Sequence, residues 1–277
     1  MPFPPTVAPE PTKSQNLFRP KFLDKQGVLM KILVTNDDGI HAKGIVVLAE
    51  ELRKLGEVAV IAPDRERSAV GHGLTLHHPL RAIELGPMIF AVDGTPTDCV
   101  NLGIHSLLPF RPDIVVSGIN RGGNLGDDVT YSGTVSAAME ATLMGIPSFA
   151  ISLVTDGSGV HYSSAAKFAC RLAEIIFERQ LPPDTFLNIN VPDLNYSEIL
   201  PAMITSQGKR RYEGLIIDKI DPRGRKYYWI GSGVQNLQYI PGSDFDVVGR
   251  GHISVTPLHI DLTNYSSMEE LKSWNLA

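Results

Sequence analysis

The sequence is poor in cysteine, in excess positive charge and in long apolar runs. Its two cysteines, Cys99 and Cys170, lack the spacing of a metal site or a redox pair, so we expect small buried residues in a reducing compartment. No run approaches the ~20 apolar residues that a membrane-spanning helix needs. The net charge of -5 gives no electrostatic basis for binding a nucleic-acid polymer, although it allows a small anionic ligand.

The first 29 residues are rich in proline and polar residues and lack the apolar segment of a secretory signal. We therefore expect a flexible extension over residues 1–29 and a cytoplasmic location. With 277 residues, of which 43% are hydrophobic, the chain can hold one large domain or two small ones. We predict one α/β domain over residues 30–277.

Two adjacent carboxylates, Asp37 and Asp38, follow the short apolar run Ile32–Val34. The run is typical of a buried parallel strand, and a helical pattern follows, so the carboxylates lie where open α/β sheets bind ligands. Neighbouring carboxylates repel unless a cation or a proton neutralises them, and Mg2+ and Mn2+ prefer oxygen ligands. The turn is about equally consistent with a metal site and with a solvated Asx-type turn.

Two further loops follow predicted strand ends. The loop 64–73 offers the hydroxyl of Ser68, and the glycine-rich segment 120–134 leads into a helical pattern over 135–144. Ser132, Gly133 and Thr134 would stand at the helix N-terminus, where unpaired N–H groups and the positive end of the dipole attract anions. Ordinary capping by Ser132 or Thr134 is the alternative, but the long glycine-rich approach favours a phosphate site.

Strand patterns alternate with helical ones up to about residue 200. This order predicts a doubly wound, mostly parallel α/β sheet of the Rossmann-like type. Extended segments at 211–218 and 225–231, joined by a turn at 221–224, then predict a β-hairpin within an excursion over 200–245. We expect the hairpin to form a subunit contact, because an exposed aromatic hairpin usually packs on something. Its aromatic residues are Tyr212, Tyr227, Tyr228 and Trp229.

The three loops together offer carboxylates, a hydroxyl, amide oxygens and an anion site. Ligation by oxygen alone favours Mg2+ or Mn2+ over zinc. A metal beside a phosphate-binding helix terminus is suited to metal-assisted phosphoester hydrolysis. The glycines match neither a Walker A loop nor G-x-G-x-x-G after the first strand, which weakens kinase and dehydrogenase interpretations.

Five segments, in order, resemble the SurE family of stationary-phase survival proteins, which act as 5'-nucleotidases. They are Ile32–Gly39, Ala62–Ser68, Asp93–Val100, Ser117–Glu140 and Val255–Thr263. The resemblance runs from residue 30 to about residue 265 and implies a SurE-type fold with one divalent metal ion per subunit. It also implies hydrolysis of nucleoside 5'-monophosphates, with 3'-monophosphates and polyphosphate as further substrates, and a homodimer or homotetramer assembled through the C-terminal excursion.

The family pattern further implies roles for individual residues. Asp37, Asp38, Ser68 and Asn120 would hold the metal, and Asn124, Ser132, Gly133 and Thr134 would line the phosphate pocket. Our mechanistic hypothesis is in-line attack on phosphorus by metal-activated water, with one aspartate as base and Asn124 meeting the developing charge. An aspartyl-phosphate intermediate is the competing route.

Two other functions compete with hydrolysis. The first is a non-catalytic protein that senses a nucleotide or a metal on the same fold. The second is a nucleotide-sugar transferase, which would need a second Rossmann-like half. Residues 200–277 are too short and too rich in strand patterns for such a half.

Overall fold

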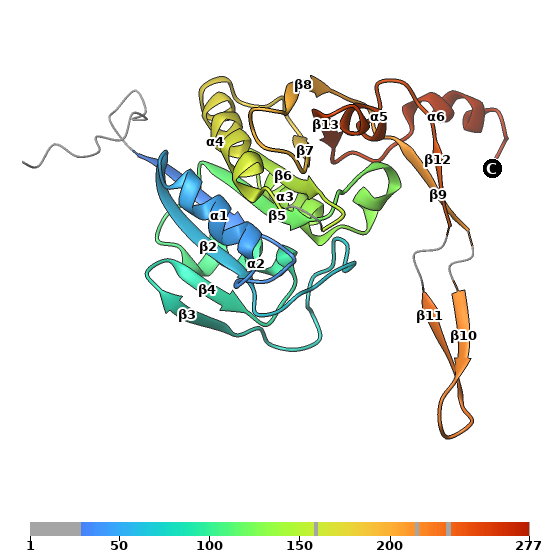
Figure 1. Ribbon diagram of the computed structural model, residues 1–277, viewed down its shortest axis with the longest axis horizontal. Helices are drawn as coiled ribbons and strands as arrows, with labels where there is room; N and C mark the ends of the chain where they lie inside the picture. The colour runs from blue at the N-terminus through green and yellow to red at the C-terminus, as the bar shows by residue number, and fades with distance from the viewer. Residues whose placement is uncertain (1–28, 158–159, 214–215, 231–233, 277) are drawn as a thin grey trace, which may run out of the picture.

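A computed structural model describes residues 29–157, 160–213, 216–230 and 234–276. Residues 1–28 of the predicted extension, and the side chain of Tyr212, lie outside the described part. Within the described part, nine strands form one sheet in the order β3-β4-β2-β1-β5-β6-β7-β13-β8 (Figure 1). The strands are β1 (Met30–Thr35), β2 (Gly56–Pro63), β3 (Ala82–Gly86), β4 (Ile89–Val92), β5 (Ile114–Arg121), β6 (Ser148–Val154), β7 (Thr185–Pro192), β8 (Leu200–Ile204) and β13 (His252–His259).

The sheet is mostly parallel and doubly wound, as predicted. Strands β4, β2, β1, β5, β6 and β7 run parallel to one another, whereas β3 and β13 pair antiparallel with their neighbours β4 and β7. Strand β1 lies in the interior of the sheet, because it pairs with β2 on one side and with β5 on the other. The carboxyl ends of β1 and β5 therefore flank the switch point, where ligands bind in sheets of this kind.

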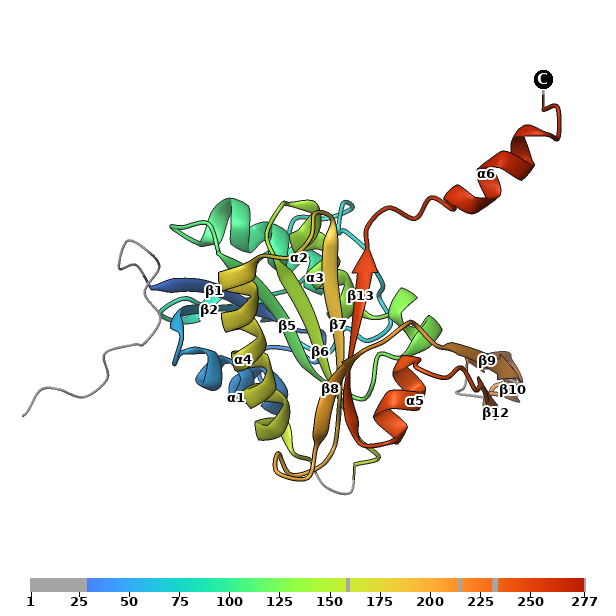
Figure 2. The same ribbon diagram turned by 90° about the horizontal axis from the view of Figure 1, so that it is seen from above.

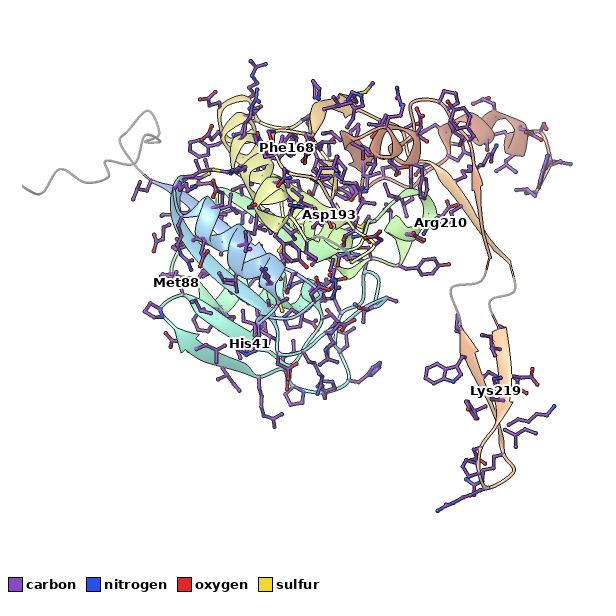
Figure 3. All side chains as sticks on the ribbon, in the orientation of Figure 1. His41, Met88, Phe168, Asp193, Arg210 and Lys219 are labelled. Carbon is purple, nitrogen blue, oxygen red and sulfur yellow. The ribbon has the colours of Figure 1, made fainter. Side chains whose placement is uncertain are left out.

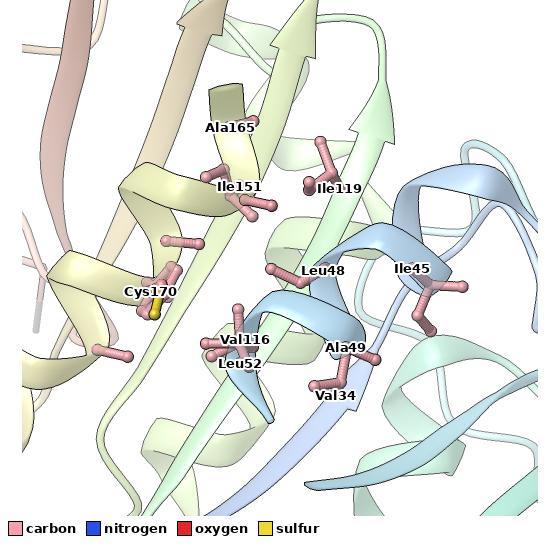
Figure 4. Packing of buried hydrophobic residues seen from close by; sticks show 14 of the residues in the cluster. Val34, Ile45, Leu48, Ala49, Leu52, Val116, Ile119, Ile151, Ala165 and Cys170 are labelled. Carbon is pink, nitrogen blue, oxygen red and sulfur yellow. The ribbon is translucent and has the colours of Figure 1, made fainter. Parts of the chain in front are cut away.

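Helices cover both faces of the sheet (Figure 2). On one face α1 (Lys43–Leu52) and α4 (Tyr162–Arg179) pack over Val34 and Val116, and Figure 4 shows this contact from close by. On the other face α2 (Pro96–Leu102), the π-helical turn η1 (Gly103–Leu107) and α3 (Gly133–Leu143) pack over Leu33 and Val115. Alternate residues of β1 and β5 thus serve two cores, and full burial of each such side chain contributes about 1.5–3 kcal/mol.

The two cysteines are buried and free, as predicted, one in each of these cores. Helix α2 starts at the N-cap residue Thr95, and Asp98 completes a capping box with it. None of the described helices has the length and apolar character that a membrane crossing requires.

The C-terminal excursion leaves the sheet as two pairs of antiparallel strands. The inner pair is β9 (Lys209–Glu213) and β12 (Val234–Gln238), and the outer pair is the hairpin β10 (Ile216–Ile220) and β11 (Lys226–Ile230). The hairpin extends away from the body of the protein (Figure 1) and confirms the predicted turn at 221–224, closed by a hydrogen bond from Gly224 N to Asp221 O at 2.9 Å. Strand β8 belongs to the main sheet, so the excursion itself begins after it.

Two short helices complete the C-terminal part of the chain. Helix α5 (Asp244–Gly249) precedes β13 and starts at the N-cap residue Ser243. Helix α6 (Tyr265–Lys272) projects from the body beyond β13 (Figure 2) and has no buried residue.

Candidate functional site

The turn after β1 is held by the side chain of Asn36. Its Oδ1 accepts a hydrogen bond from Gly39 N at 3.2 Å, and its Nδ2 donates to Gly39 O at 3.0 Å. The Asx-type bonding considered for this turn is therefore present, but Asn36 makes it. Asp37 is only 6% exposed and Asp38 is half-buried, so the carboxylates of the turn are not simply solvated.

The two aspartates disfavour each other's charge. Burial is the main cause that raises the pKa of Asp38 to about 6, and the neighbouring charge of Asp37 raises it further. Burial also raises the pKa of Asp37, against the opposing effect of its hydrogen bond from Thr134. The charge of Glu66 acts on both carboxylates in the same direction. A cation beside the pair would remove this penalty.

The Ser68 loop lies directly against this turn. The peptide N–H of Arg67 donates to Asp37 O at 2.8 Å, and its guanidinium Nη2 donates to Asp93 O at 2.8 Å. Ser68 is exposed, and its hydroxyl donates to Glu66 Oε1 at 2.6 Å. The loop thus brings a hydroxyl oxygen and one further carboxylate to the edge of the aspartate pair.

The end of β5 reaches the pair from the other side. The peptide N–H of Arg121 donates to Asp38 Oδ2 at 3.1 Å, which places Asn120 one residue from a direct contact with the turn. The side-chain nitrogen of Asn120 donates to Gly122 O at 2.9 Å. The amide oxygen of Asn120 is then the side-chain atom suited to bind a cation.

The N-terminus of α3 meets Asp37. Ser132 is the N-cap residue, and its Oγ accepts a hydrogen bond from Val135 N at 3.1 Å, so the capping alternative describes this side chain. The hydroxyl of Thr134 donates to Asp37 Oδ1, and the Thr134 peptide N–H also hydrogen-bonds to this carboxylate. A Cβ added at Gly133 would lie 2.9 Å from Asp37 Cβ, so glycine is required for this approach. The positive end of α3 therefore faces the carboxylate of Asp37.

Asn124 is anchored to the sheet. Its side-chain Nδ2 donates to Ser152 Oγ at 2.8 Å, and its peptide N–H donates to Asn190 Oδ1 at 2.9 Å. Its carbonyl accepts from Asn188 Nδ2 at 2.7 Å and from Asn190 Nδ2 at 2.9 Å. These contacts fix the glycine-rich loop over β6 and β7, and they commit one amide hydrogen of Asn124 to the sheet.

The four candidate metal ligands have the oxygen atoms that a hard cation prefers. Within the described part of the chain, no three His, Cys, Asp or Glu side chains form a metal-binding group. The set Asp37, Asp38, Ser68 and Asn120 offers two carboxylates with a hydroxyl and an amide oxygen. Oxygen donors of this kind suit Mg2+ or Mn2+, and the raised pKa values of the paired aspartates give an electrostatic reason for a cation to bind there.

Three residues near the site were not singled out from the sequence. Arg121 contacts Asp38 through its backbone, and Tyr162 lies near enough that the charge of Asp38, after burial, raises its pKa. Glu140 of α3 binds His72 of the Ser68 loop, with 2.6 Å between His72 Nε2 and Glu140 Oε2. His72 thus anchors its loop to α3. Only the position of Arg121 beside Asn120 gave a sequence signal.

The fold and the site define a doubly wound α/β protein with a paired-carboxylate site at the switch point of its sheet. A family model described as survival protein SurE matches residues 32–214, and the chain belongs to this family. This confirms the resemblance noted from the sequence.

Similar proteins cover nearly the whole chain. One is the 5'-nucleotidase SurE of Geotalea daltonii, 68% identical over 247 residues, which are 89% of this chain and 100% of that protein. Another is the 5'-nucleotidase SurE of Geobacter sulfurreducens, 67% identical over 90% of this chain and 95% of that protein. The crystal structure of the SurE protein from Aquifex aeolicus has a TM-score of 0.77 and 43% identity, covering 87% of this chain and 98% of that chain.

Proposed function

We propose that this protein is a divalent-metal-dependent 5'-nucleotidase, which hydrolyses nucleoside 5'-monophosphates to a nucleoside and phosphate. The observation that carries the proposal is the similarity to the 5'-nucleotidase SurE of Geotalea daltonii. The entire length of that protein matches 89% of this chain at 68% identity. The paired aspartates between the Ser68 loop, the end of β5 and the N-terminus of α3 supply suitable chemistry. Hydrolysis of 3'-monophosphates and polyphosphate belongs to the same proposal.

One Mg2+ or Mn2+ ion per subunit would be held by Asp37, Asp38, the Ser68 hydroxyl and the Asn120 amide oxygen. When bound, such an ion neutralises charge on the phosphoryl group and activates water. The phosphate would lie at the N-terminus of α3, near Ser132, Gly133 and Thr134, where the dipole of the helix favours an anion. Asn124 has a second amide hydrogen beyond the one bound to Ser152, and it would donate this hydrogen to a phosphoryl oxygen.

In the proposed reaction the oxygen of a water molecule attacks phosphorus in line with the leaving oxygen of the nucleoside. A carboxylate of the pair takes one proton from the water, the P–O ester bond breaks, and the leaving oxygen takes a proton from solvent. Asp38 is the better placed base, because Asp37 is more deeply buried and is already bonded to Thr134. The developing charge on the phosphoryl group is met by the positive end of α3.

Attack by an aspartate carboxylate on phosphorus is the competing route. It would form an aspartyl-phosphate and release the nucleoside first, and water would then release phosphate. A nucleoside 5'-phosphorothioate made chiral at phosphorus with oxygen isotopes, hydrolysed in isotopically labelled water, separates the routes. Net inversion at phosphorus supports direct attack, whereas net retention supports the covalent route, because two successive in-line displacements restore the configuration.

The two alternative functions gain no support from the structure. Beyond β8 the described residues form the excursion, α5, β13 and α6, so they contain no second Rossmann-like half of the kind a nucleotide-sugar transferase needs. No specific observation favours a non-catalytic sensor, and its ligands would be the same nucleotide and metal.

Phosphate release from nucleoside 5'- and 3'-monophosphates and from polyphosphate tests the proposal. The folded protein is assayed with Mg2+, with Mn2+ and with EDTA. Metal-dependent release from 5'-monophosphates supports the proposal and ranks the bases. The absence of release with either metal, from protein whose fold is verified by circular dichroism, refutes it and favours the sensor.

We also propose that the protein assembles as a homodimer or homotetramer through the C-terminal excursion. The hairpin carries exposed apolar side chains, and α6 adds others. Those of the hairpin are Ile216, Ile217, Ile220, Tyr227, Tyr228, Trp229 and Ile230. Patches of this kind mark association surfaces. A monomer in light scattering at micromolar concentration would refute assembly.

The cytoplasmic location stays a prediction from the sequence.

A further inference from the structure

The base of the excursion contacts the turn that leads to the proposed phosphate site. This turn is the 3-10 helix η2 (Gly126–Thr130), which ends two residues before the N-cap residue Ser132. Hydrogen bonds from Tyr131 N to Asp128 O at 3.0 Å and from Ser132 N to Val129 O at 3.4 Å connect η2 to that N-cap. The position of η2 therefore bears directly on the N-terminus of α3.

Asp244, the first residue of α5, is fully buried and receives three peptide N–H groups. Its Oδ2 accepts from Gly126 N at 2.8 Å. Its Oδ1 accepts from Gly208 N at 2.9 Å and from Phe245 N at 2.8 Å. One side chain thus joins η2, the segment that enters the excursion and the start of α5.

Further contacts hold η2 to the same segment. Gln207 Nε2 donates to Gly126 O at 2.7 Å, and Arg210 N donates to Asp127 Oδ2 at 3.1 Å. The guanidinium of Arg210 forms an ion pair with Asp128 and lies 4.9 Å from the ring centre of Phe245. Figure 3 shows Arg210 at the base of the excursion.

Gly126 adopts a backbone conformation that favours glycine, and it lies close to both Phe245 and Gly208. Its φ of +53° lies in the left-handed region, and a Cβ added there would lie 2.7 Å from the Phe245 ring and 2.9 Å from Gly208 O. A residue with a side chain would push η2 away from Asp244. Both the carboxylate and the glycine are thus adapted to a close approach of the two segments.

We propose that Asp244 is a positioning residue for the phosphate site, which fixes η2 against the base of the excursion and so sets the position of Ser132, Gly133 and Thr134. This inference rests on the proposed function, since it concerns the binding of the same phosphate group. Asp244 acts through η2 and does not itself contact substrate. The hydrogen bonds of Asp244 also link the proposed phosphate site to the excursion, which carries the exposed hairpin.

Asp244→Asn should remove one of the three hydrogen bonds of this residue and keep the other two. An asparagine side chain keeps one oxygen acceptor and replaces the other with an NH2 donor. The orientation that keeps both bonds to Gly208 and Phe245 places the NH2 group opposite the N–H of Gly126 and releases η2. Asp246→Asn on the same helix is the matched control, because Asp246 binds Gly242 N and Arg250 near the surface. Gln207→Ala is a second, milder variant. It removes the hydrogen bond from the exposed Gln207 side chain to Gly126 O.

The measurements are kcat and KM for a nucleoside 5'-monophosphate, the affinity for inorganic phosphate by calorimetry with Mn2+, and Tm. For Asp244→Asn we expect KM and the phosphate Kd to rise about tenfold, equivalent to ~1.4 kcal/mol, with a smaller change in kcat. Gln207→Ala should move both values in the same direction by about threefold, which is roughly 0.65 kcal/mol. Asp246→Asn should leave both unchanged.

A purely structural role would lower Tm without changing KM or the phosphate Kd, and that result would overturn the proposal. If Asp244→Asn does not fold, Gln207→Ala decides, and wild-type KM and phosphate affinity in that variant would overturn it as well. Failure of the proposed function is distinguishable, because it would show as an inactive wild-type protein. In that case the phosphate Kd would still show whether the contacts of Asp244 position the phosphate site.

Discussion

Replacing Asp38 with asparagine should stabilise the protein without metal while abolishing turnover. Asparagine removes one of two adjacent charges and keeps an oxygen that can accept the hydrogen bond from Arg121 N. The raised pKa of Asp38, about 6 against an ordinary 3.8, corresponds to an upper limit of about 3 kcal/mol against folding at neutral pH. Asp38 is partly exposed, so solvent screening lowers this to about 1–2 kcal/mol.

The sign of the pH dependence follows from the direction of the pKa shift. A carboxyl group whose pKa is higher in the folded state binds more protons when folded, so stability falls as pH rises between 3.8 and about 6. Below the lower value both states carry a proton on Asp38 and no penalty exists. Above the upper value the full penalty is present, and it is this penalty that asparagine removes.

The assay is thermal unfolding in EDTA at about pH 7.5 and at about pH 3, which is below the lower of the two pKa values. At the higher pH the variant should unfold about 2–8 °C above the wild type, given about 2–4 °C per kcal/mol for a chain of this size. At the lower pH the difference should vanish. The exposed Glu84, replaced by glutamine, is the control and should change neither value.

Mn2+ completes the test. It should raise the Tm of the wild type by preferential binding to the folded state, and it should raise that of the Asp38→Asn variant much less. A variant that is no more stable than the wild type in EDTA at the higher pH would refute the idea of repelling, cation-seeking carboxylates. A stability difference that persists at the lower pH would refute the assignment to the charge of Asp38. Near-normal turnover in the variant at saturating metal would refute the metal site itself.

Three further predictions concern the metal, the phosphate and the assembly. Asn120→Ala should weaken Mn2+ binding about tenfold, or ~1.4 kcal/mol, and should lower Tm in EDTA only slightly, through the lost bond to Gly122 O. Wild-type affinity by calorimetry would exclude Asn120 as a ligand. Inorganic phosphate should bind at least about tenfold more weakly in EDTA than with Mn2+, because the negative aspartates would otherwise repel it; equal affinity would contradict this. Trp229→Asp should lower the mass measured by light scattering, whereas an exposed Glu84→Gln control should not, and an unchanged mass would exclude the hairpin from the contact.

The order of the elements, and the position of the candidate site, were predicted from local sequence patterns. Apolar runs that end in polar turns place Asp37 and Asn120 at the carboxyl ends of strands, and a glycine-rich approach marks the start of α3. These signals are local, because each depends on a few consecutive residues. The family resemblance then supplied the roles that local patterns left open.

What the sequence could not predict depends on contacts between distant segments. Nothing near Asn124 in the sequence indicates that Ser152 and Asn190 hold it. The bond between His72 and Glu140 joins a loop to a helix 68 residues away. Asp244 has the pattern of an ordinary first-turn acid in α5, and its bond to Gly126, 118 residues away, becomes visible only when the chain is folded.

The contact between Asp37 and α3 bears on how one helix terminus can serve both a carboxylate and a phosphate. Without metal, the positive end of α3 and the Thr134 hydroxyl partly compensate the buried Asp37 charge, yet burial still raises its pKa. A phosphate that arrived first would add negative charge beside this aspartate in the same confined space. A cation bound to the aspartates would reverse the sign of the local field, and the helix terminus would then act on a phosphate together with the cation. The geometry therefore favours metal before substrate in the proposed site, where Gly133 allows the carboxylate of Asp37 to approach the N-terminus of α3.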